Sequence, residues 1–241
     1  MEDYLQRKAD FYLAELKNNS YPGRGLVLGV DETGESLIQL YWIMGRSATS
    51  RNRIFICDGD VLKTDLADPG KVKPDEDTSL IIYTAMADDF FTFAVSNGHQ
   101  TMNVLEYGMY GAMKKWQYEP DANYTPRIIG AWTFNHEIPV AQIAILFKPP
   151  YGMQCDRILY SYGKISDGYG YCIHTYDGDG EPLPSFSKDP YPIPLKGKPE
   201  EILSTYWDAL NQDNRVSIAL KTISIKSHES SVLLINKHSP V

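Results

Sequence analysis

The stretch LIQLYWIMGRSATSRNRIFIC, residues 37–57, decides the fold, because two apolar segments in it flank a short cationic loop. The segments at 37–44 and 53–57 are rich in β-branched and aromatic residues, which is typical of buried strands. The loop between them carries Arg46, Arg51 and Arg53. An arginine fork can hold a phosphate or a carboxylate through two parallel hydrogen bonds, and neighbouring serine hydroxyls can complete such a site. The loop is therefore either an anion-binding site or a solvated turn whose arginines pair with surface carboxylates, and this stretch alone favours neither.

The chain as a whole is acidic, with 23 Lys and Arg against 31 Asp and Glu and a net charge of −8 over 241 residues. This balance disfavours nucleic acids and anionic membranes as partners, since both need a broad basic face. No run approaches the ~18 apolar residues of a membrane-spanning helix, and the charged N-terminus lacks the features of a signal peptide. Three separated cysteines without a Cys-x-x-Cys motif indicate reduced thiols. We therefore expect a cytoplasmic protein with no membrane and no nucleic-acid partner.

Hydrophobic periodicity predicts a strand-rich chain with three helices. The helices are expected at residues 2–18, 101–116 and 200–211. The strands are expected at residues 25–30, 37–44, 53–57, 78–86, 90–95, 127–134, 140–147, 157–163, 168–176, 216–225 and 231–237. Residues 181–199 hold six prolines and no periodicity, so we expect an extended surface arm there. Because the strands come mostly in hairpins and the helices do not alternate with them, we expect an α+β fold in one domain over residues 1–241.

Two later polar clusters interrupt the predicted strands. SNGHQT, residues 96–101, lies between an apolar strand and a helix start, where free backbone N–H groups favour an anion or a polar ligand. Its alternative interpretation is a plain turn at Asn97-Gly98 with Thr101 as a helix cap. YEPDANYTPR, residues 118–127, combines acidic residues with an arginine in an aromatic-rich loop, and its alternative interpretation is a solvated loop.

Three further motifs are weaker indications of a site. GRGLVLG at residues 23–29 begins a strand instead of linking a strand to a helix, so we do not expect a dinucleotide-binding loop. DGDGE at residues 177–181 resembles the start of a calcium loop, but Lys188 stands at the twelfth position, where an EF-hand needs a bidentate glutamate. The five histidines show no paired spacing of metal ligands. We expect neither a metal nor a cofactor.

In their order and spacing, the three polar clusters resemble the archaeal-type inosine monophosphate (IMP) cyclohydrolase family. The matching segments are GRSATSRNR at 45–53, VSNGHQT at 95–101 and YEPDANYTPRI at 118–128, and a looser likeness reaches the predicted helix near residue 199. The resemblance implies a fold similar to that of N-terminal-nucleophile hydrolases, a four-layer αββα sandwich of two antiparallel sheets flanked by helices. Residues 1–20 would then be an N-terminal helical extension. Since Gly23-Arg24-Gly25 supplies no Ser, Thr or Cys nucleophile at the equivalent strand start, we do not expect amide hydrolysis by the mechanism of those hydrolases.

The activity that the resemblance implies is ring closure of 5-formamidoimidazole-4-carboxamide ribonucleotide to IMP and water, in de novo purine biosynthesis. An amide nitrogen is a poor nucleophile that needs a proton acceptor, and the formyl oxygen needs a cation or a hydrogen-bond donor. Arg51, Tyr83 and Glu119 match the catalytic residues of the family. Glu119 would accept the amide proton or orient the amide, while Tyr83 and Arg51 would face the formyl oxygen. The candidates for substrate binding are Arg46, Ser47, Arg53, Ser96, Asn97, Gly98, His99 and Arg127.

One position departs from the archaeal pattern, because Gln117 stands where that pattern has an acidic residue, and a two-carboxylate mechanism is therefore in doubt. Two alternative functions remain open. One is another ribonucleotide cyclohydrolase or amidohydrolase on the same fold, and the other is a non-catalytic purine-nucleotide-binding protein. We expect a purine ribonucleotide as the small-molecule partner and a homo-oligomer as the assembly.

Overall fold

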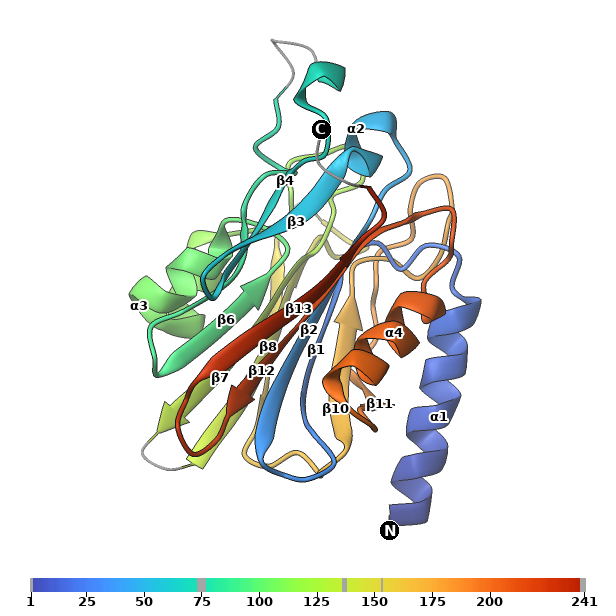
Figure 1. Ribbon diagram of the computed structural model, residues 1–241. Coiled ribbons are helices and arrows are strands. Elements are labelled where there is room, and N and C mark those ends of the chain that lie inside the picture. Colours follow the sequence, from blue (N-terminus) through green and yellow to red (C-terminus); the bar gives the residue numbers. More distant parts are fainter. Residues whose placement is uncertain (1, 73–76, 136–137, 153, 239–241) are drawn as a thin grey trace.

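The computed structural model describes residues 2–72, 77–135, 138–152 and 154–238, and the strands of these residues form two antiparallel sheets (Figure 1). The first sheet has the strand order β11-β10-β1-β2-β12-β13. Its strands are β1 (Gly25–Val30), β2 (Ser36–Met44), β10 (Tyr169–His174), β11 (Tyr191–Pro194), β12 (Arg215–Ser224) and β13 (Ser230–Asn236). The β1–β2 hairpin is closed by Asp31, whose Oδ1 accepts hydrogen bonds from the backbone N–H groups of Glu35 and Ser36, at 3.0 Å each.

The second sheet contains the middle of the chain, with the strands in sequence order from β3 to β9. Its strands are β3 (Arg53–Asp58), β4 (Val61–Leu66), β5 (Thr84–Asp88), β6 (Thr92–Ser96), β7 (Arg127–Asn135), β8 (Ile138–Phe147) and β9 (Asp156–Tyr162). Each strand pairs with its predecessor in the chain, so the sheet is a meander. Short connections between antiparallel strands explain why most of these hairpins are visible in the sequence.

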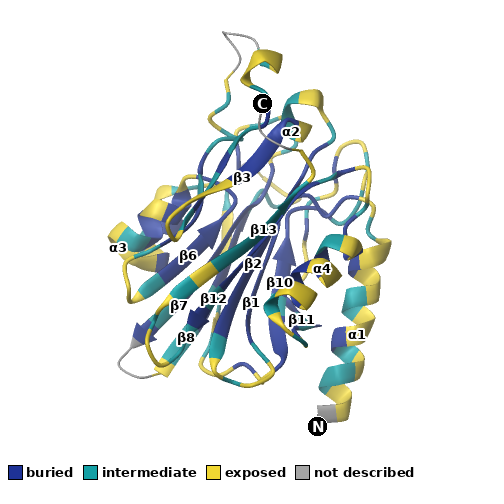
Figure 2. Ribbon diagram, viewed as in Figure 1, coloured by how far each residue is buried: buried dark blue, intermediate teal, exposed yellow. Residues whose placement is uncertain are grey.

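Helices cover the outer faces of the two sheets (Figure 1). The helices α1 (Glu2–Asn18) and α4 (Pro199–Ala209) lie on the first sheet, and α3 (Gln100–Lys115) lies on the second. A four-residue helix, α2 (Ala48–Arg51), and a 3₁₀ turn, η1 (Pro69–Lys71), lie at one end of the molecule. The large buried side chains between the sheets include Trp42, Phe93 and Trp132, and a smaller apolar cluster packs beneath α3. Figure 2 shows that buried residues run along most of β1, β2, β6 and β10. The protein is therefore an α+β structure in which helices flank two antiparallel sheets.

The proline-rich segment at 181–199 differs from the extended surface arm that the sequence predicts. Tyr191–Pro194 forms β11, which pairs with β10, and Phe186, Ile193 and Leu195 are buried. Prolines are tolerated here because β11 is the edge strand and needs hydrogen bonds along one side only. The segment is part of the sheet and its core.

Three further elements differ from the sequence-based predictions. The strand β4 and the helix α2 were not predicted, and β5 begins at Thr84 where a strand was expected from residue 78. Both missed elements are short, and only Leu62 and Thr64 of β4 are buried, so neither leaves a strong periodic signal. No helix in the described ranges is both long enough and apolar enough to cross a membrane.

Antiparallel pairing brings the three polar clusters and the start of β1 to the same end of the molecule. In such a pair the first residue of one strand lies beside the last residues of its neighbour. Gly25 at the start of β1 is thus paired with Trp42 near the end of β2 and with His174 at the end of β10. Ser96 at the end of β6 is paired with Ile129 near the start of β7. The end of the molecule that carries α2 is therefore where a site can be assembled (Figure 1).

Candidate active site

A cavity of about 310 Å³ lies where these strand ends converge. It is bounded by the start of β1, the end of β2, the loop that holds α2, the start of β3 and the loop between α3 and β7. The residues that line it are Tyr21, Gly23, Arg24, Met44, Arg46, Ser47, Ser50, Arg53, Leu80, Ile81, Glu119, Asp121, Asn123, Thr125, Tyr176 and Leu183. Three arginines and two carboxylates thus share one polar cavity, which suits a ligand that carries both charge and hydrogen-bonding groups.

Glu119 is the most deeply buried carboxylate of this cavity, with 2% of the residue exposed. Nη1 and Nη2 of Arg24 donate to its two carboxylate oxygens, at 2.9 and 2.6 Å, and Nη1 of Arg127 lies 3.6 Å from Oε1. The backbone N–H of Glu119 donates to the Thr125 carbonyl oxygen at 2.8 Å, which folds the loop so that the side chain points inward. A bidentate arginine fixes the orientation of a carboxylate as well as its charge.

Arg24 is held in its charged form by this arrangement. Burial opposes the charge, but the Glu119 carboxylate and then the Tyr83 hydroxyl outweigh burial, and the pKa of Arg24 is raised well above its ordinary value. Nη1 of Arg24 also donates to the Asn97 carbonyl oxygen at 3.2 Å. Arg24 and Glu119 therefore form a buried, hydrogen-bonded ion pair. Loss of either partner would leave the other charge buried and unpaired.

Tyr83 is 3% exposed, is not among the residues that line the cavity, and is close enough to Arg24 and Arg53 to oppose the lowering of both pKa values by burial. Its hydroxyl is 2.7 Å from the hydroxyl of Tyr41, and its backbone N–H donates to Oγ1 of Thr64 at 2.8 Å. Burial, together with the neighbouring Tyr83, raises the pKa of Tyr41 well above its ordinary value, so Tyr41 keeps its proton. One of the two hydroxyl protons forms the hydrogen bond between the tyrosines, and the other can be donated to a different acceptor.

Arg53 is a buried cation of the cavity, with 3% of the residue exposed. Its Nε and Nη2 donate to the carbonyl oxygens of Ser50 and Met44, at 2.8 and 2.9 Å, while Nη1 makes no hydrogen bond with the described residues. Burial lowers the pKa of Arg53, partly offset by Tyr83, and no carboxylate pairs with it among the described residues. An arginine remains charged even so. Arg53 therefore brings an uncompensated positive charge to the cavity.

Arg51 lies elsewhere, although it is only two residues away. Its Nε donates to the Gly45 carbonyl oxygen and its Nη2 to Oδ1 of Asn214, at 3.0 Å each. It lines a separate cavity together with Lys71 and Lys237. The structure therefore places Glu119 and Arg53 on one cavity, leaves Tyr83 just outside its lining and places Arg51 on another cavity.

Arg46 and Ser47 line the outer part of the cavity. Nη1 of Arg46 donates to Oδ1 of Asp179 at 2.7 Å, and its guanidinium lies over the ring of Tyr21. The Ser47 hydroxyl accepts from the backbone N–H of Ser50 and caps α2. Both side chains are partly open to solvent, so both can exchange these contacts for a ligand.

The cluster at 96–101 does not line the cavity but holds in place the loop that carries Glu119. Oδ1 of Asn97 accepts from the backbone N–H of Ile128 at 2.9 Å, and its Nδ2 donates to the Pro126 carbonyl oxygen at 2.9 Å. The Ser96 hydroxyl bonds within its own turn, and a Cβ at Gly98 would collide with Arg127. These three predicted residues therefore fix the loop that presents Glu119.

His99 and Arg127 line a neighbouring cavity of about 610 Å³, together with Gln117. The guanidinium of Arg127 stacks on Trp116 at 4.7 Å, and its Nη1 donates to Oε1 of Gln100 at 3.1 Å. Nε of Arg127 is buried without a hydrogen-bond partner among the described residues. Gln117, where the archaeal pattern is acidic, thus faces this second cavity and is not among the residues lining the Glu119 cavity.

No group of three or more His, Cys, Asp or Glu side chains in the described ranges is placed to hold a metal ion. A comparison with protein-family models matches residues 21–228 to the IMP cyclohydrolase-like protein family. The chain belongs to this family. A search of curated proteins finds no match. The family match confirms the resemblance drawn from the three polar clusters, and it supports a cyclohydrolase function in general terms.

Arg24 is the residue of the Glu119 cavity, in this IMP cyclohydrolase-like chain, whose importance was not predicted from the sequence. It lies in GRGLVLG, which the sequence excludes as a dinucleotide-binding loop and as the position of a nucleophile, and neither exclusion assigns a role to the arginine. A signal was present, because an arginine placed immediately before a fully buried strand must find a partner or a ligand in the interior. Tyr21 and Tyr176, which stack on each other at the cavity wall, carry no such signal.

Proposed function

We propose that this protein closes the purine ring, converting 5-formamidoimidazole-4-carboxamide ribonucleotide to IMP and water. The observation that carries the proposal is that a carboxylate and a guanidinium with no described carboxylate partner line the same cavity. The carboxylate of Glu119 is held by Arg24, and the uncompensated guanidinium of Arg53 lines the same cavity, with the tyrosine pair nearby. The family match supports a nucleotide as the substrate.

The chemistry needs little beyond positioning and proton transfer. The carboxamide nitrogen attacks the formyl carbon, the new C–N bond forms, the nitrogen loses a proton and the formyl oxygen becomes a hydroxyl group. Loss of that hydroxyl group with a second proton, as water, completes the aromatic ring. Because both reacting groups belong to one molecule, holding the folded conformer supplies a large part of the rate advantage.

We assign the role of proton acceptor to Glu119. The fork of Arg24 occupies one lone-pair direction on each carboxylate oxygen and leaves others for an amide N–H. A positioned general base of this kind contributes about 10²–10⁴ in rate. Arg24 then acts as a positioning residue, which holds the carboxylate in one orientation toward the cavity.

We assign the stabilisation of the formyl oxygen to Arg53 and Tyr83. Arg53 thereby takes the role that the sequence analysis gave to Arg51. Among the described residues, both arginines donate through Nε and Nη2 to protein oxygens, but Arg53 lines the Glu119 cavity whereas Arg51 lines a separate one. Negative charge that develops on the oxygen would be stabilised by the buried guanidinium, and Tyr83 would donate its hydroxyl proton. A single donor of this kind contributes about 10²–10³ in rate.

The remaining cavity residues are proposed to bind the ribonucleotide. Arg46 and Ser47 lie at the open side, where a phosphate can remain partly solvated, and Tyr21 and Tyr176 form an aromatic wall. In this proposal Ser96, Asn97 and Gly98 support the Glu119 loop, and His99 and Arg127 face the neighbouring cavity.

The proposal is tested by mixing the purified protein with the formamido ribonucleotide in the presence of EDTA and following the ultraviolet change of ring closure. The same assay with other purine-pathway ribonucleotides measures specificity. Turnover of the formamido compound alone is the expected result. Turnover of a different ribonucleotide would assign another cyclohydrolase reaction, and IMP binding without turnover of any compound would assign a nucleotide-binding role.

A further inference from the structure

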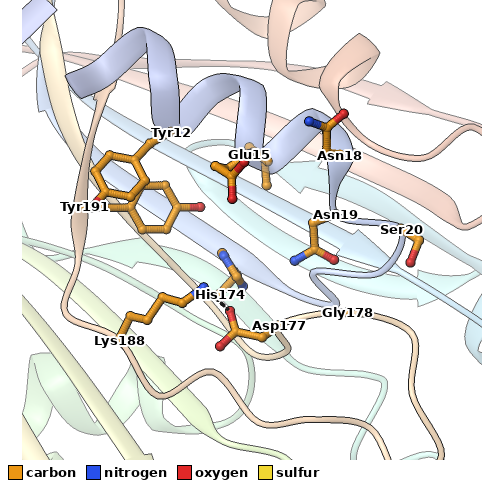
Figure 3. Close-up of a pocket in the computed structure, with 11 residues that line it drawn as sticks. Tyr12, Glu15, Asn18, Asn19, Ser20, His174, Asp177, Gly178, Lys188 and Tyr191 are labelled. Carbon is orange, nitrogen blue, oxygen red and sulfur yellow. Dashed lines mark hydrogen bonds and ion pairs between the residues drawn. The ribbon is translucent and has the colours of Figure 1, made fainter. Parts of the chain in front are cut away.

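A second cavity, of about 340 Å³, lies between α1 and the segment that follows β10 (Figure 3). We call it the α1 pocket, and the residues used below are Tyr12, Glu15, His174, Asp177, Lys188 and Tyr191. The helix α1 lies outside residues 21–228, which the family model matches, so one wall of this pocket is built by a segment outside the family match. The pocket is separate from the Glu119 cavity, because no residue lines both.

His174 forms the base of the α1 pocket and is 4% exposed. Its Nδ1 lies 3.0 Å from the Tyr176 carbonyl oxygen. A carbonyl oxygen can only accept, so Nδ1 carries the proton and Nε2 has a free lone pair. Burial lowers the pKa of His174 to about 3, which keeps the ring neutral near pH 7. No described residue makes a hydrogen bond to Nε2, and the pocket therefore holds an unpartnered acceptor on a ring that is largely buried.

The charged side chains around His174 also favour a ligand that donates hydrogen bonds and carries positive charge. Asp177 and Lys188 form an ion pair at 3.3 Å and largely cancel each other. Glu15 lies in the last turns of α1 and is exposed, and its carboxylate makes no hydrogen bond or ion pair with the described residues. The C-terminal end of a helix is itself partly negative. The net charge that faces the pocket is therefore negative.

Aromatic rings form the remaining wall. Tyr12 of α1 and Tyr191 of β11 stack with their ring centroids 4.8 Å apart, and Tyr191 meets the edge of His174 at 5.7 Å. Figure 3 shows Glu15 above His174 with the two tyrosines beside them. Rings of this kind bind a cation over their faces.

We propose that the α1 pocket binds a small organic cation with an ammonium or amidinium group, whose N–H donates to Nε2 of His174 and whose charge is balanced by Glu15. A neutral or anionic compound of the same shape lacks one or both of these interactions. A cavity of this size admits a single small ring or a short amine.

The test uses the full chain and three compounds of matched shape: benzamidine, which is cationic, benzamide, which is neutral, and benzoate. Calorimetry is expected to show binding of benzamidine, with benzamide and benzoate at least about tenfold weaker. Glu15→Gln is expected to weaken benzamidine about fivefold, and Glu32→Gln, an exposed change at the β1–β2 turn, leaves it unchanged. The ¹⁵N resonance of Nε2 of His174 is expected to shift during the titration.

Three results would overturn the proposal. They are an absence of benzamidine binding up to its solubility limit, equal binding by the wild-type protein and Glu15→Gln, and an unmoved Nε2 resonance at saturating benzamidine. The last would place the compound elsewhere on the protein. None of these readouts depends on the cyclohydrolase activity, so the two proposals stand or fall separately.

Discussion

Glu119 is the residue on which the proposed chemistry depends, and its burial decides how it must be held. A carboxylate in an apolar interior is stable only when it is paired and hydrogen-bonded. Arg24 supplies both requirements at 2.6 and 2.9 Å, with Arg127 as a second cation. The same contacts leave the carboxylate oriented toward the cavity, so the stability of the pair and its proposed function have one structural cause.

Separate removal of the two partners is expected to be costly, and joint removal less so. Arg24→Gln and Glu119→Gln should each lower the free energy of unfolding by about 3–5 kcal/mol, because each leaves a buried charge unpaired. The double variant should fall short of their sum by about 1–3 kcal/mol in urea titrations. Arg46→Gln, which breaks a half-exposed pair with Asp179, is the control and should cost below about 1 kcal/mol. Additive single effects would show that Arg24 and Glu119 do not interact.

His174 predicts a pH dependence of stability whose sign follows from its lowered pKa. The unfolded chain binds a proton at this residue below about pH 6.5, whereas the folded protein does so only near pH 3. Stability from this group is therefore present above pH 6.5 and is lost as the pH falls. Between pH 6.5 and pH 5 the loss is about 2 kcal/mol.

The matched measurement is the unfolding free energy of the wild-type protein and of His174→Gln over this pH range. Glutamine can still donate to the Tyr176 carbonyl oxygen but cannot titrate. The wild-type curve should fall more steeply than that of the variant. Parallel curves would show that His174 is not buried in its neutral form.

At the scale of elements, β11 shows why the proline-rich segment could not be predicted as part of a sheet. Its four residues contain two prolines, and its partner β10 lies almost twenty residues away in sequence, so neither periodicity nor a hairpin signal is present. The strands β1 and β2, in contrast, are joined by a turn with a clear signal and were predicted at nearly their observed bounds. Local hairpins could therefore be predicted, and nonlocal edge pairing could not.

Ile193 tests whether this segment belongs to the core. It is fully buried in β11, and Ile193→Ala should lower the free energy of unfolding by about 2–4 kcal/mol through lost burial and a new cavity. Ile138, at the start of β8, is 65% exposed, and Ile138→Ala is expected to change stability by less than about 0.5 kcal/mol. Denaturant unfolding of both variants makes the comparison. Equal, small effects would mean that residues 181–199 form a free arm after all.

The sequence also could not predict how α2 orients its neighbouring arginines. The sequence predicted a cationic loop correctly as a feature, but the choice between Arg51 and Arg53 depends on a four-residue helix that turns Arg51 toward Asn214. Arg53 begins β3 and points into the cavity. A shift of two residues moves a guanidinium from one cavity to another, and residue spacing alone does not resolve that difference.

At the scale of the whole molecule, the antiparallel topology is what makes a site from distant segments. Strand starts and ends from both sheets meet at the end that carries α2, and each delivers one polar residue or loop to the cavity (Figure 1). The polar clusters could be found in the sequence because they interrupt apolar strands. Which of their residues face one another depended on the packing of the two sheets, and so Arg24 was missed.

The measurement that tests the central claim most directly is turnover of the formamido ribonucleotide by Arg53→Ala and Arg51→Ala, two identical changes made two residues apart. We predict that Arg53→Ala lowers kcat/KM by at least about 10²-fold, because a buried donor to the formyl oxygen is lost, and that Arg51→Ala stays within about threefold of the wild-type protein. Arg53→Lys, which keeps the charge and loses the fork, should fall between them, and thermal melting confirms that each variant is folded. The opposite order, with Arg51→Ala inactive and Arg53→Ala active, would contradict the account.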